Sequence, residues 1–375
     1  MTSLAMRFGV SFSLILLAVS LNAQPRPLNV SAQPVLTLGA DESNQATTFT
    51  AVVGATRLPN GRIIVGDRAE MSLKVFSAQG KLIKSYGRKG SGPGELSYLA
   101  HFWRCGSEFF TYDIDNGNRT SVFTLEGAYQ RQFRFGSPQK STPYATSCNA
   151  AQQFVHFGWE VDKEMKGGTF RSNVPFWFSR GDERIGVALG EFAGSERYGL
   201  VEGGAIRGTR PLALGKHPSV AIGSNRAYVG TADSFAIMVF DLSGKRIGLL
   251  NERRALVPVT KNDIDEEHAR EIASDGKNWK QGIERDYAKM TFPKSLPAYS
   301  AFLIDALDKL WVKDFPRSAS STVRWSTFSN DGKAEGQVLL PTNLDVFEIG
   351  TDYILGRYLD PKESVPQVRL YKLTR

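Results

Sequence analysis

Four ring-bearing side chains lie at matching places in successive segments of the chain, and a ligand or a metal could use their chemistry. They are two imidazoles and two phenols, His101, Tyr144, His217 and Tyr299. Gathered at one site, they would suit an anionic or sugar-like ligand, or supply part of a zinc site. A catalytic zinc needs about three protein ligands, and the other histidines, His156 and His268, lie at unmatched positions. Zinc is therefore poorly supported, and the alternative is that both matched histidines are polar residues of a rim.

A second set of candidates is charged and follows directly after short apolar segments. Its members are Asp67, Arg68, Asp113, Asp115, Asp233, Lys313, Asp314 and Arg357. Mixed charges at one mouth suit recognition of a polar ligand, and clustered carboxylates can bind calcium through about six to eight oxygens. In the structural alternative, each aspartate accepts hydrogen bonds from the backbone of its own turn. Neither calcium nor zinc has a complete ligand set in the sequence, so the cofactor is unknown.

The segments that must position these side chains repeat along the chain, most clearly at residues 57–87. Strand-like runs occur there at about 50–57, 62–66, 73–77 and 81–86. Asn60-Gly61 favours a type I′ hairpin turn, because both central positions of that turn want a positive φ. Gln79-Gly80 marks the turn between the last two strands. Four antiparallel strands in sequence order are the unit of a β-propeller blade.

The unit recurs as imperfect repeats along the chain. These copies predict an all-β fold, a six-bladed β-propeller. Residues 143–211 form a longer and more degenerate copy, and if they conceal two blades the count becomes seven. Strands are expected in that copy at residues 153–158, 174–179 and 184–189. The last copy, residues 345–375, lacks an obvious fourth strand. Residues 35–38 could complete it, which would close the ring and remove exposed strand edges.

Residues 260–292, between blades 4 and 5, break the strand pattern and predict two short helices. Asn262 can cap the first helix, whose first turn is rich in acids that the helix dipole favours. Gly276 would end this helix, and a second is expected over residues 279–289. Loops at this place in a blade open on one face of a propeller, so the insertion should lie over or beside the central channel. It would act either as a lid or partner-docking element, or as packing on the rim.

Residues 1–23 have the pattern of a cleaved signal peptide. Arg7 supplies the positive start, and Leu21-Asn22-Ala23 ends on a small residue, as cleavage sites do. The apolar run between them is shorter than the roughly 20 residues of a membrane span. The alternative is an uncleaved anchor. The mature chain, residues 24–375, is then expected to be one propeller domain, periplasmic or secreted and not membrane-spanning.

The chain has two cysteines, Cys105 and Cys148. In an oxidising compartment such a pair is a candidate disulfide. Each cysteine lies four residues after the expected start of an inner strand, so both fall near the far end of the channel in adjacent blades. Equivalent positions tend to point the same way around the ring, which counts against a direct bridge. Buried free thiols are the alternative.

Residues 85–96 (SYGRKGSGPGEL) resemble the connector between blades in NHL-type six-bladed propellers. The resemblance is close over residues 57–100 and thins to a general blade pattern over residues 101–340. The segments 310–314 and 349–356 are similar to exported bacterial six-bladed propeller proteins of unknown function. The resemblance implies a scaffold that serves both for binding and for enzymes such as lactonases and amidating lyases.

Two functions from different classes follow. The first is an exported binding or interaction propeller, a monomer that recognises a protein, a glycan or a small polar ligand at the channel mouth. The second is a metal-dependent hydrolase or lyase, lactonase-like or amidating-lyase-like, with its site at the same mouth. No complete catalytic set is visible, which favours the first function and leaves enzymatic activity open. The formal charge of +8 is modest and dispersed, so nucleic acid is not expected as a partner.

Overall fold

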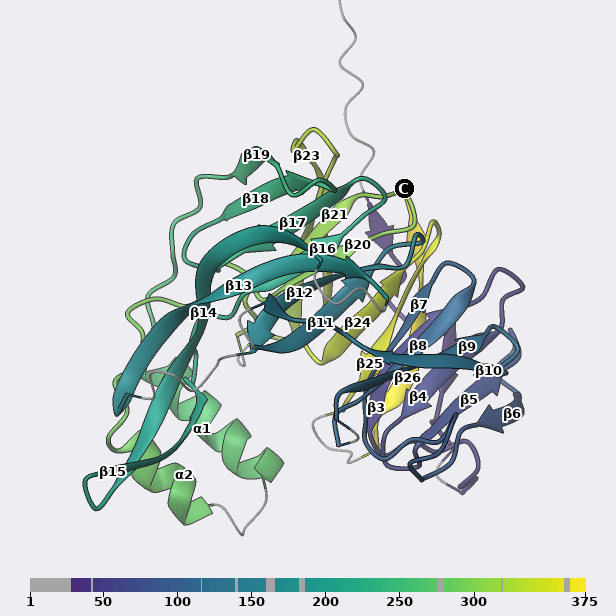
Figure 1. Ribbon diagram of the computed structural model, residues 1–375, viewed down its shortest axis with the longest axis horizontal. Coiled ribbons are helices and arrows are strands. Elements are labelled where there is room, and N and C mark those ends of the chain that lie inside the picture. Colours follow the sequence, from purple (N-terminus) through teal and green to yellow (C-terminus); the bar gives the residue numbers. More distant parts are fainter. Residues whose placement is uncertain are drawn as a thin grey trace, which may run out of the picture.

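Six antiparallel sheets follow one another around a ring (Figure 1). The computed structural model describes residues 28–41, 43–115, 117–138, 141–159, 166–181, 186–275, 280–317, 320–360 and 365–375. The first strand of each sheet contacts the first strand of the next, and the sixth contacts the first. The prediction of a six-bladed β-propeller is therefore confirmed. The expected signal peptide, residues 1–23, lies outside the described residues.

Blades 1, 2, 4 and 5 are four-stranded meanders, with the strands paired in sequence order. Blade 1 consists of β3 (Val52–Arg57), β4 (Ile63–Asp67), β5 (Ser72–Phe76) and β6 (Leu82–Tyr86). Blade 2 consists of β7 (Leu99–Cys105), β8 (Glu108–Asp113), β9 (Arg119–Thr124) and β10 (Tyr129–Arg134). Blade 4 consists of β16 (Ser219–Ile222), β17 (Arg226–Gly230), β18 (Ala236–Asp241) and β19 (Arg246–Asn251). Blade 5 consists of β20 (Ala301–Ile304), β21 (Leu310–Lys313), β22 (Thr322–Phe328) and β23 (Ala334–Pro341).

Blade 3 has five strands in a single sheet, so the longer copy does not conceal a seventh blade. Its strands are β11 (Thr142–Cys148), β12 (Gln153–Trp159), β13 (Gly168–Arg180), β14 (Val187–Glu202) and β15 (Ala205–Pro211). β13 and β14 are the two longest strands in the described chain, at 13 and 16 residues. They run past the edge of the blade and, with β15, form an arm that reaches the helices (Figure 1).

Two helices between blades 4 and 5, α1 (Lys261–Asp275) and α2 (Lys280–Tyr287), form the insertion. Thr260, not the expected Asn262, caps α1. The Thr260 hydroxyl accepts the Asp263 N–H at 3.2 Å, and the Asp263 carboxylate accepts the Thr260 N–H at 2.9 Å. This reciprocal pair is a capping box, which satisfies two donors where Asn262 would satisfy one. The expected boundary at Gly276 lies outside the described residues.

An apolar cluster attaches the insertion to the arm. From α2 it contains Ile283 and Tyr287, and from the arm and the segment after it Tyr198 and Leu212, with Met290 beyond α2. Burial of this cluster, rather than helix propensity, stabilises two helices this short.

The ring is closed by strands from both ends of the described chain. Blade 6 consists of β24 (Leu344–Ile349), β25 (Tyr353–Tyr358) and β26 (Gln367–Thr374), with β1 (Asn29–Val30) and β2 (Leu36–Leu38) paired to β26. In β2, Leu36 pairs with Leu370 and Leu38 with Val368. The expected closure by residues 35–38 is present, and β1 adds a second, shorter contact to the same strand.

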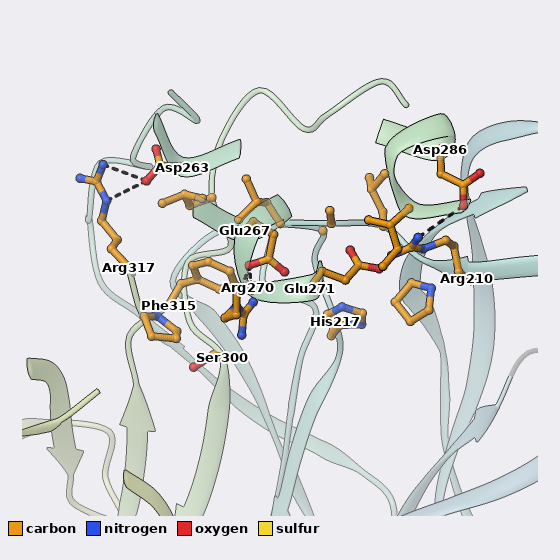
Figure 2. Close-up of a pocket in the computed structure, with 18 of the residues that line it drawn as sticks. Arg210, His217, Asp263, Glu267, Arg270, Glu271, Asp286, Ser300, Phe315 and Arg317 are labelled. Atoms are coloured by element: carbon orange, nitrogen blue, oxygen red, sulfur yellow. Dashed lines mark hydrogen bonds and ion pairs between the residues drawn. The ribbon is translucent and has the colours of Figure 1, made fainter. Parts of the chain in front are cut away.

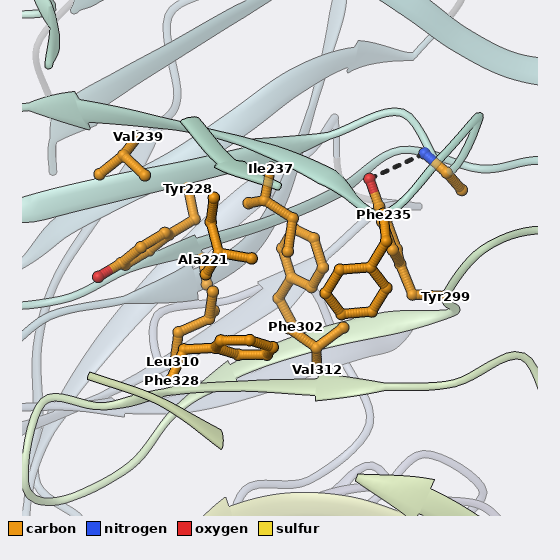
Figure 3. Close-up of a cluster of buried hydrophobic side chains, with 12 residues drawn as sticks. Ala221, Tyr228, Phe235, Ile237, Val239, Tyr299, Phe302, Leu310, Val312 and Phe328 are labelled. Atoms are coloured by element: carbon orange, nitrogen blue, oxygen red, sulfur yellow. Dashed lines mark hydrogen bonds between the residues drawn. The ribbon is translucent and has the colours of Figure 1, made fainter. Parts of the chain in front are cut away.

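A separate apolar cluster fills each of the six seams between neighbouring blades. Figure 3 shows the seam between blades 4 and 5, where Tyr299 contacts Phe235 and Phe302, and Phe235 also contacts Phe328. The stability of the ring is therefore distributed over six interfaces, each made from side chains of two blades.

The seam between blades 2 and 3 also contains the disulfide Cys105–Cys148, with the two Cα atoms 5.8 Å apart. The equal spacing in the sequence hides a β-bulge in β11, where the register shifts between Ala145 and Ser147. From His101 to Cys105 the paired partner advances four positions, from Tyr112 to Glu108, without a shift. From Tyr144 to Cys148 it advances three, from Phe157 to Phe154. Side chains alternate between the faces of a strand, so the bulge turns Cys148 towards Cys105 of the neighbouring blade 2.

Candidate functional site

A cavity of about 1190 Å³ lies between the insertion and the blades. We call it the insertion cavity. Its upper wall consists of residues from α1 and α2, and another wall consists of the segment 210–217, which leads from the arm to blade 4. The floor comes from blades 5 and 6, with Ser300, Lys313 and Asp345 at the starts of first strands or the ends of second strands. The insertion thus covers one mouth of the channel, on the blade 4 to blade 6 side.

Ion pairs hold both helices in place around the cavity (Figure 2). Arg210, at the end of β15, pairs with Glu271 of α1 and with Asp286 of α2, the latter at 3.4 Å. Arg317, in the loop after β21, donates two hydrogen bonds to Asp263 of α1 at 3.0 and 3.1 Å. The side chains of the Arg210 pairs are mostly buried, so the attraction there is less screened than in open solvent, whereas Arg317 is exposed and reaches a buried Asp263.

A smaller cavity of about 360 Å³ lies deeper, at the first strands of blades 3 to 5. It shares Pro211, His217, Ser300 and Ala301 with the insertion cavity. Tyr144 and Arg197 line it from blade 3. Because the two cavities have these walls in common, a ligand under the helices would also approach the channel.

Lys313 is the basic side chain of the insertion cavity that stands apart from the others. The lysine is 9% exposed, and within the described part of the chain its ammonium has neither an ion pair nor a hydrogen bond. The Trp325 ring lies 5.9 Å from the ammonium, at the limit of a cation–π contact. Burial lowers the pKa of Lys313 below its usual value, and the Asp345 carboxylate opposes this only in part.

The four ring-bearing candidates separate into different environments. His217 lines both cavities, and Tyr144 lines the deeper one. Burial lowers the pKa of His217 and raises that of Tyr144. His101 contacts the Tyr144 ring, with 5.4 Å between the ring centroids, and burial lowers its pKa to about 4, helped by the Arg68 guanidinium. Tyr299 lies instead in the seam between blades 4 and 5, where it is 1% exposed.

Asp67 and Asp113 have a structural role. The Asp67 carboxylate accepts the backbone N–H groups of Thr50, Ala51 and Ala69, at 2.9 to 3.2 Å. The Asp113 carboxylate accepts those of Ser97 and Tyr98, at 2.7 and 2.9 Å. Each aspartate therefore ties the end of a second strand to the segment that leads into the first strand of the same blade. The sequence left open a backbone role within the aspartate's own turn, but of these donors only Ala69 belongs to such a turn, and the others lie in the segment before the blade.

The remaining charged candidates are engaged by neighbours. Arg68 stacks on the Tyr98 ring at 5.1 Å, and Asp233 pairs with Arg171 at 2.7 Å. Arg357 pairs with Asp345 and donates to the Val52 carbonyl at 2.8 Å.

Two further candidates fall outside the cavities as well. Asp314 pairs with Arg254 at 3.0 Å and with Arg324 at 2.7 Å, and Asp115 lies in an exposed turn. Of the charged set, Lys313 is the member that lines the insertion cavity.

Several wall residues were not among the sequence candidates, notably Arg210, Arg317, Glu271 and Ser300. One signal was available for the helix residues, because an acid-rich helical insertion in an all-β chain needs basic partners. Nothing in the sequence marked Arg210 or Arg317 as those partners, since each lies far from its acid along the chain.

No group of three or more His, Cys, Asp or Glu side chains is arranged to hold a metal ion in the described residues. His101 contacts Trp103, Tyr112 and Tyr144, and His217 faces the cavities. Across the described ranges, no helix is long and apolar enough to cross a membrane.

Comparisons with known proteins agree on the fold. Residues 48–132 match the model of a family described as a 6-bladed beta-propeller, DUF5128. Among solved structures, the chain is similar to a member of the DUF4221 family from Bacteroides vulgatus, with 12% identity and a TM-score of 0.50 over 94% of this chain and 100% of that chain. A putative exported protein from Bacteroides fragilis has 12% identity and a TM-score of 0.49, over 92% of this chain and 95% of that one.

A virginiamycin B lyase from Staphylococcus aureus is a further structural match, with 13% identity and a TM-score of 0.40 over 93% of this chain and 99% of that chain. None of the curated proteins matches the chain. At these identities the structural likeness concerns the propeller fold and not the activity.

Proposed function

We propose that this chain is an exported binding propeller that holds a small polar ligand in the insertion cavity. The observation that carries the proposal is the cavity itself, whose walls come from the insertion, the arm and two blades. Its volume of about 1190 Å³ is slightly above the roughly 300–1,000 Å³ common for small-molecule sites. Packing on the rim alone would not require a space of this size between the insertion and the blades.

The lining favours binding over catalysis. Its acids are engaged by arginines, as the Arg210 and Arg317 pairs illustrate. A general acid or base needs a carboxyl group free to exchange a proton with the substrate. Apolar side chains such as Leu214, Ile283 and Phe315 alternate with these charged groups, a mixture that suits a ligand with both polar and apolar faces.

Two features support export. The Cys105–Cys148 disulfide suits an oxidising compartment, and residues 1–23 have the composition of a secretory signal. The ligand is therefore expected outside the cytoplasm.

The proposal is tested by thermal shift measurements on residues 24–375 with a panel of sugars, sugar acids, amino acids, dipeptides and small carboxylic acids. A ligand that binds only the folded state raises the melting temperature, and calorimetry then gives its Kd. Hydrogen exchange should show protection of residues 210–217 and of α2 on binding. Protection confined to another face, or no binder in the panel, would reject the proposal.

A blocking variant checks the location. Gly282 of α2 lines the cavity, and a Cβ atom added there would meet no other atom within 4 Å. Gly282→Trp should therefore fill the cavity without disturbing the fold and abolish binding. The matched control is Gly208→Trp, on β15 and away from the cavity lining, where a Cβ is equally unhindered. Equal affinities of the two variants would contradict the assignment.

A further inference from the structure

The insertion cavity is lined by five acids and five arginine or lysine side chains, and Lys313 stands outside the ion pairs that these groups form. Its acids are Asp263, Glu267, Glu271, Asp286 and Asp345. Each has an arginine partner: Arg317, Arg270, Arg210, Arg210 with Arg285, and Arg357, respectively. Within the described residues, Lys313 is then the lining cation that forms no ion pair, although the Asp345 carboxylate acts on it. Asp345 is itself paired with Arg357, which lies outside the lining. With Arg357 counted, one positive charge is in excess at the floor of the cavity.

The position of Lys313 within its blade shows that this charge is unusual for the fold. In blade 1 the last residue of the second strand, Asp67, is paired in the sheet with the first residue of β3, Val52. Asp113 of blade 2 is paired with Leu99 in the same way, and Lys313 of blade 5 with Ala301. The three residues thus occupy the same pairing position in their blades, where Asp67 and Asp113 are almost fully buried and Lys313 is 9% exposed.

The chemistry at this place differs between the blades. Asp67 and Asp113 are carboxylates that accept backbone N–H groups at the entrance to their blades. An ammonium is a donor only and cannot accept those hydrogen bonds. In blade 5 the acceptor at this place is the backbone carbonyl of Lys313, which accepts the Ser300 N–H at 2.8 Å. The Lys313 side chain is therefore not needed to hold the blade together.

A sheltered charge with no ion pair or hydrogen bond is costly, because the ion loses part of its hydration and gains little in return. Folded proteins avoid such groups unless the charge has another role. We propose that Lys313 anchors the ligand, and that the ligand carries a single carboxylate. One uncompensated positive charge matches a monoanion better than a phosphate, whose charge at neutral pH is close to two. This inference rests on the proposed function and identifies the ligand class of the same cavity.

The decisive experiment compares acids with their amides, which keep the shape of the ligand and remove its charge. The probes are glucuronate and glucuronamide, phenylacetate and phenylacetamide, and inorganic phosphate, titrated calorimetrically at neutral pH. Each acid should bind about tenfold more tightly than its amide or better, which corresponds to about 1.4 kcal/mol. In Lys313→Met the acid should lose this advantage while the amide keeps its affinity. Lys313→Arg should restore part of the preference because it restores the charge.

The matched control is Lys333→Met. Lys333 belongs to the same blade, is exposed, and pairs with Asp331 in the turn before β23. This variant should leave the acid preference unchanged. A general effect of the protein's positive charge would reduce the preference in both methionine variants, and that result would overturn the inference.

The outcomes separate the two proposals. If neutral compounds bind in the cavity and are blocked by Gly282→Trp, but acids gain nothing over amides, the anchor inference fails and the proposed function stands. Phosphate binding more tightly than both carboxylates would also overturn the inference. If no compound of any class binds, the proposed function fails as well. The melting temperature and circular dichroism of each variant establish that it is folded.

Discussion

At the scale of single residues, one position in the blade carries two different kinds of chemistry. Asp67 and Asp113 accept backbone N–H groups and hold their blades together. Lys313, at the equivalent place in blade 5, makes no such contact and faces a cavity. Asp67 and Asp113 therefore stabilise the fold, whereas the charge of Lys313 destabilises it and is explained by ligand binding.

Lys313→Met should raise the free energy of unfolding at pH 7, by about 1 kcal/mol, because it removes a sheltered charge that forms no ion pair or hydrogen bond. Burial lowers the pKa of Lys313 in the folded protein. Below that lowered pKa, both states hold the proton and the folded state carries the full cost. As the pH rises through it, the unfolded state binds more protons than the folded state, so the wild type gains stability relative to the variant.

Urea unfolding at pH 7 and at pH 9.5 measures this difference, which should shrink at the higher pH. Lys333→Met, which removes an exposed lysine, should show no gain at either pH. A Lys313→Met variant less stable than the wild type at pH 7 would show that Lys313 serves the fold.

Sequence patterns identified Lys313 and His217 as candidates, because both lie where a blade meets the channel mouth. The same alignment selected Tyr299, whereas its neighbour Ser300 lines the cavities. Side chains alternate along an extended segment, so an alignment one residue out exchanges a wall residue for a core residue. The Tyr299 hydroxyl accepts the Ala232 N–H at 3.0 Å, which satisfies a phenol that would otherwise be buried without a partner.

At the scale of elements, the insertion and the arm of blade 3 depend on each other. The turn signals and the strand periodicity were enough to predict the meanders and the two helices. The length of β13 and β14 was not predictable, because the arm that they form packs on the insertion, which lies far away in the sequence. Tyr198 of β14 packs in the cluster with Ile283 and Tyr287, and Arg210 of β15 pairs with Glu271. Local patterns do not carry such distant contacts. The insertion cavity forms where the arm and the insertion meet, so it could not be predicted from the sequence either.

Arg210→Met should loosen the insertion while leaving the ring intact. The change removes the guanidinium that joins α1 and α2 to β15, so the partly buried Glu271 and Asp286 each lose an ion pair. Removing one member of a sheltered ion pair is destabilising, so we expect local destabilisation by about 1–2 kcal/mol. Hydrogen exchange should then be about tenfold faster in α1 and α2 and unchanged in blades 1 and 2.

Arg207→Met is the matched control, because Arg207 lies on the same strand and makes an exposed pair with Glu202 at 4.0 Å. Such a surface pair contributes little, so this variant should exchange like the wild type. If Arg210→Met also leaves the exchange of the helices unchanged, the apolar cluster with Ile283 and Tyr287 alone holds the insertion.

At the scale of the whole molecule, closure of the ring joins residues from opposite ends of the described chain. The shortage of strands in the last copy was enough to predict closure by residues 35–38. The disulfide was harder, because the bulge that turns Cys148 towards Cys105 leaves no mark in the spacing of the residues. Counting strands and residue spacings in the sequence can therefore reveal that a strand is missing. It does not reveal a β-bulge that changes the direction of a side chain.

Leu38→Ala should open the seam between blades 6 and 1 before any other seam. Leu38 is 3% exposed and packs in the cluster with Phe49 and Val368, so its truncation should cost about 2–5 kcal/mol. β2 has three residues and therefore few hydrogen bonds to keep the ring closed once this contact is lost. Urea unfolding gives the loss, and hydrogen exchange should rise first in β2 and β26. Val35→Ala, at a residue that is 60% exposed, should change neither measurement. Unfolding of Leu38→Ala at the wild-type urea concentration would show that blade 6 closes without β2.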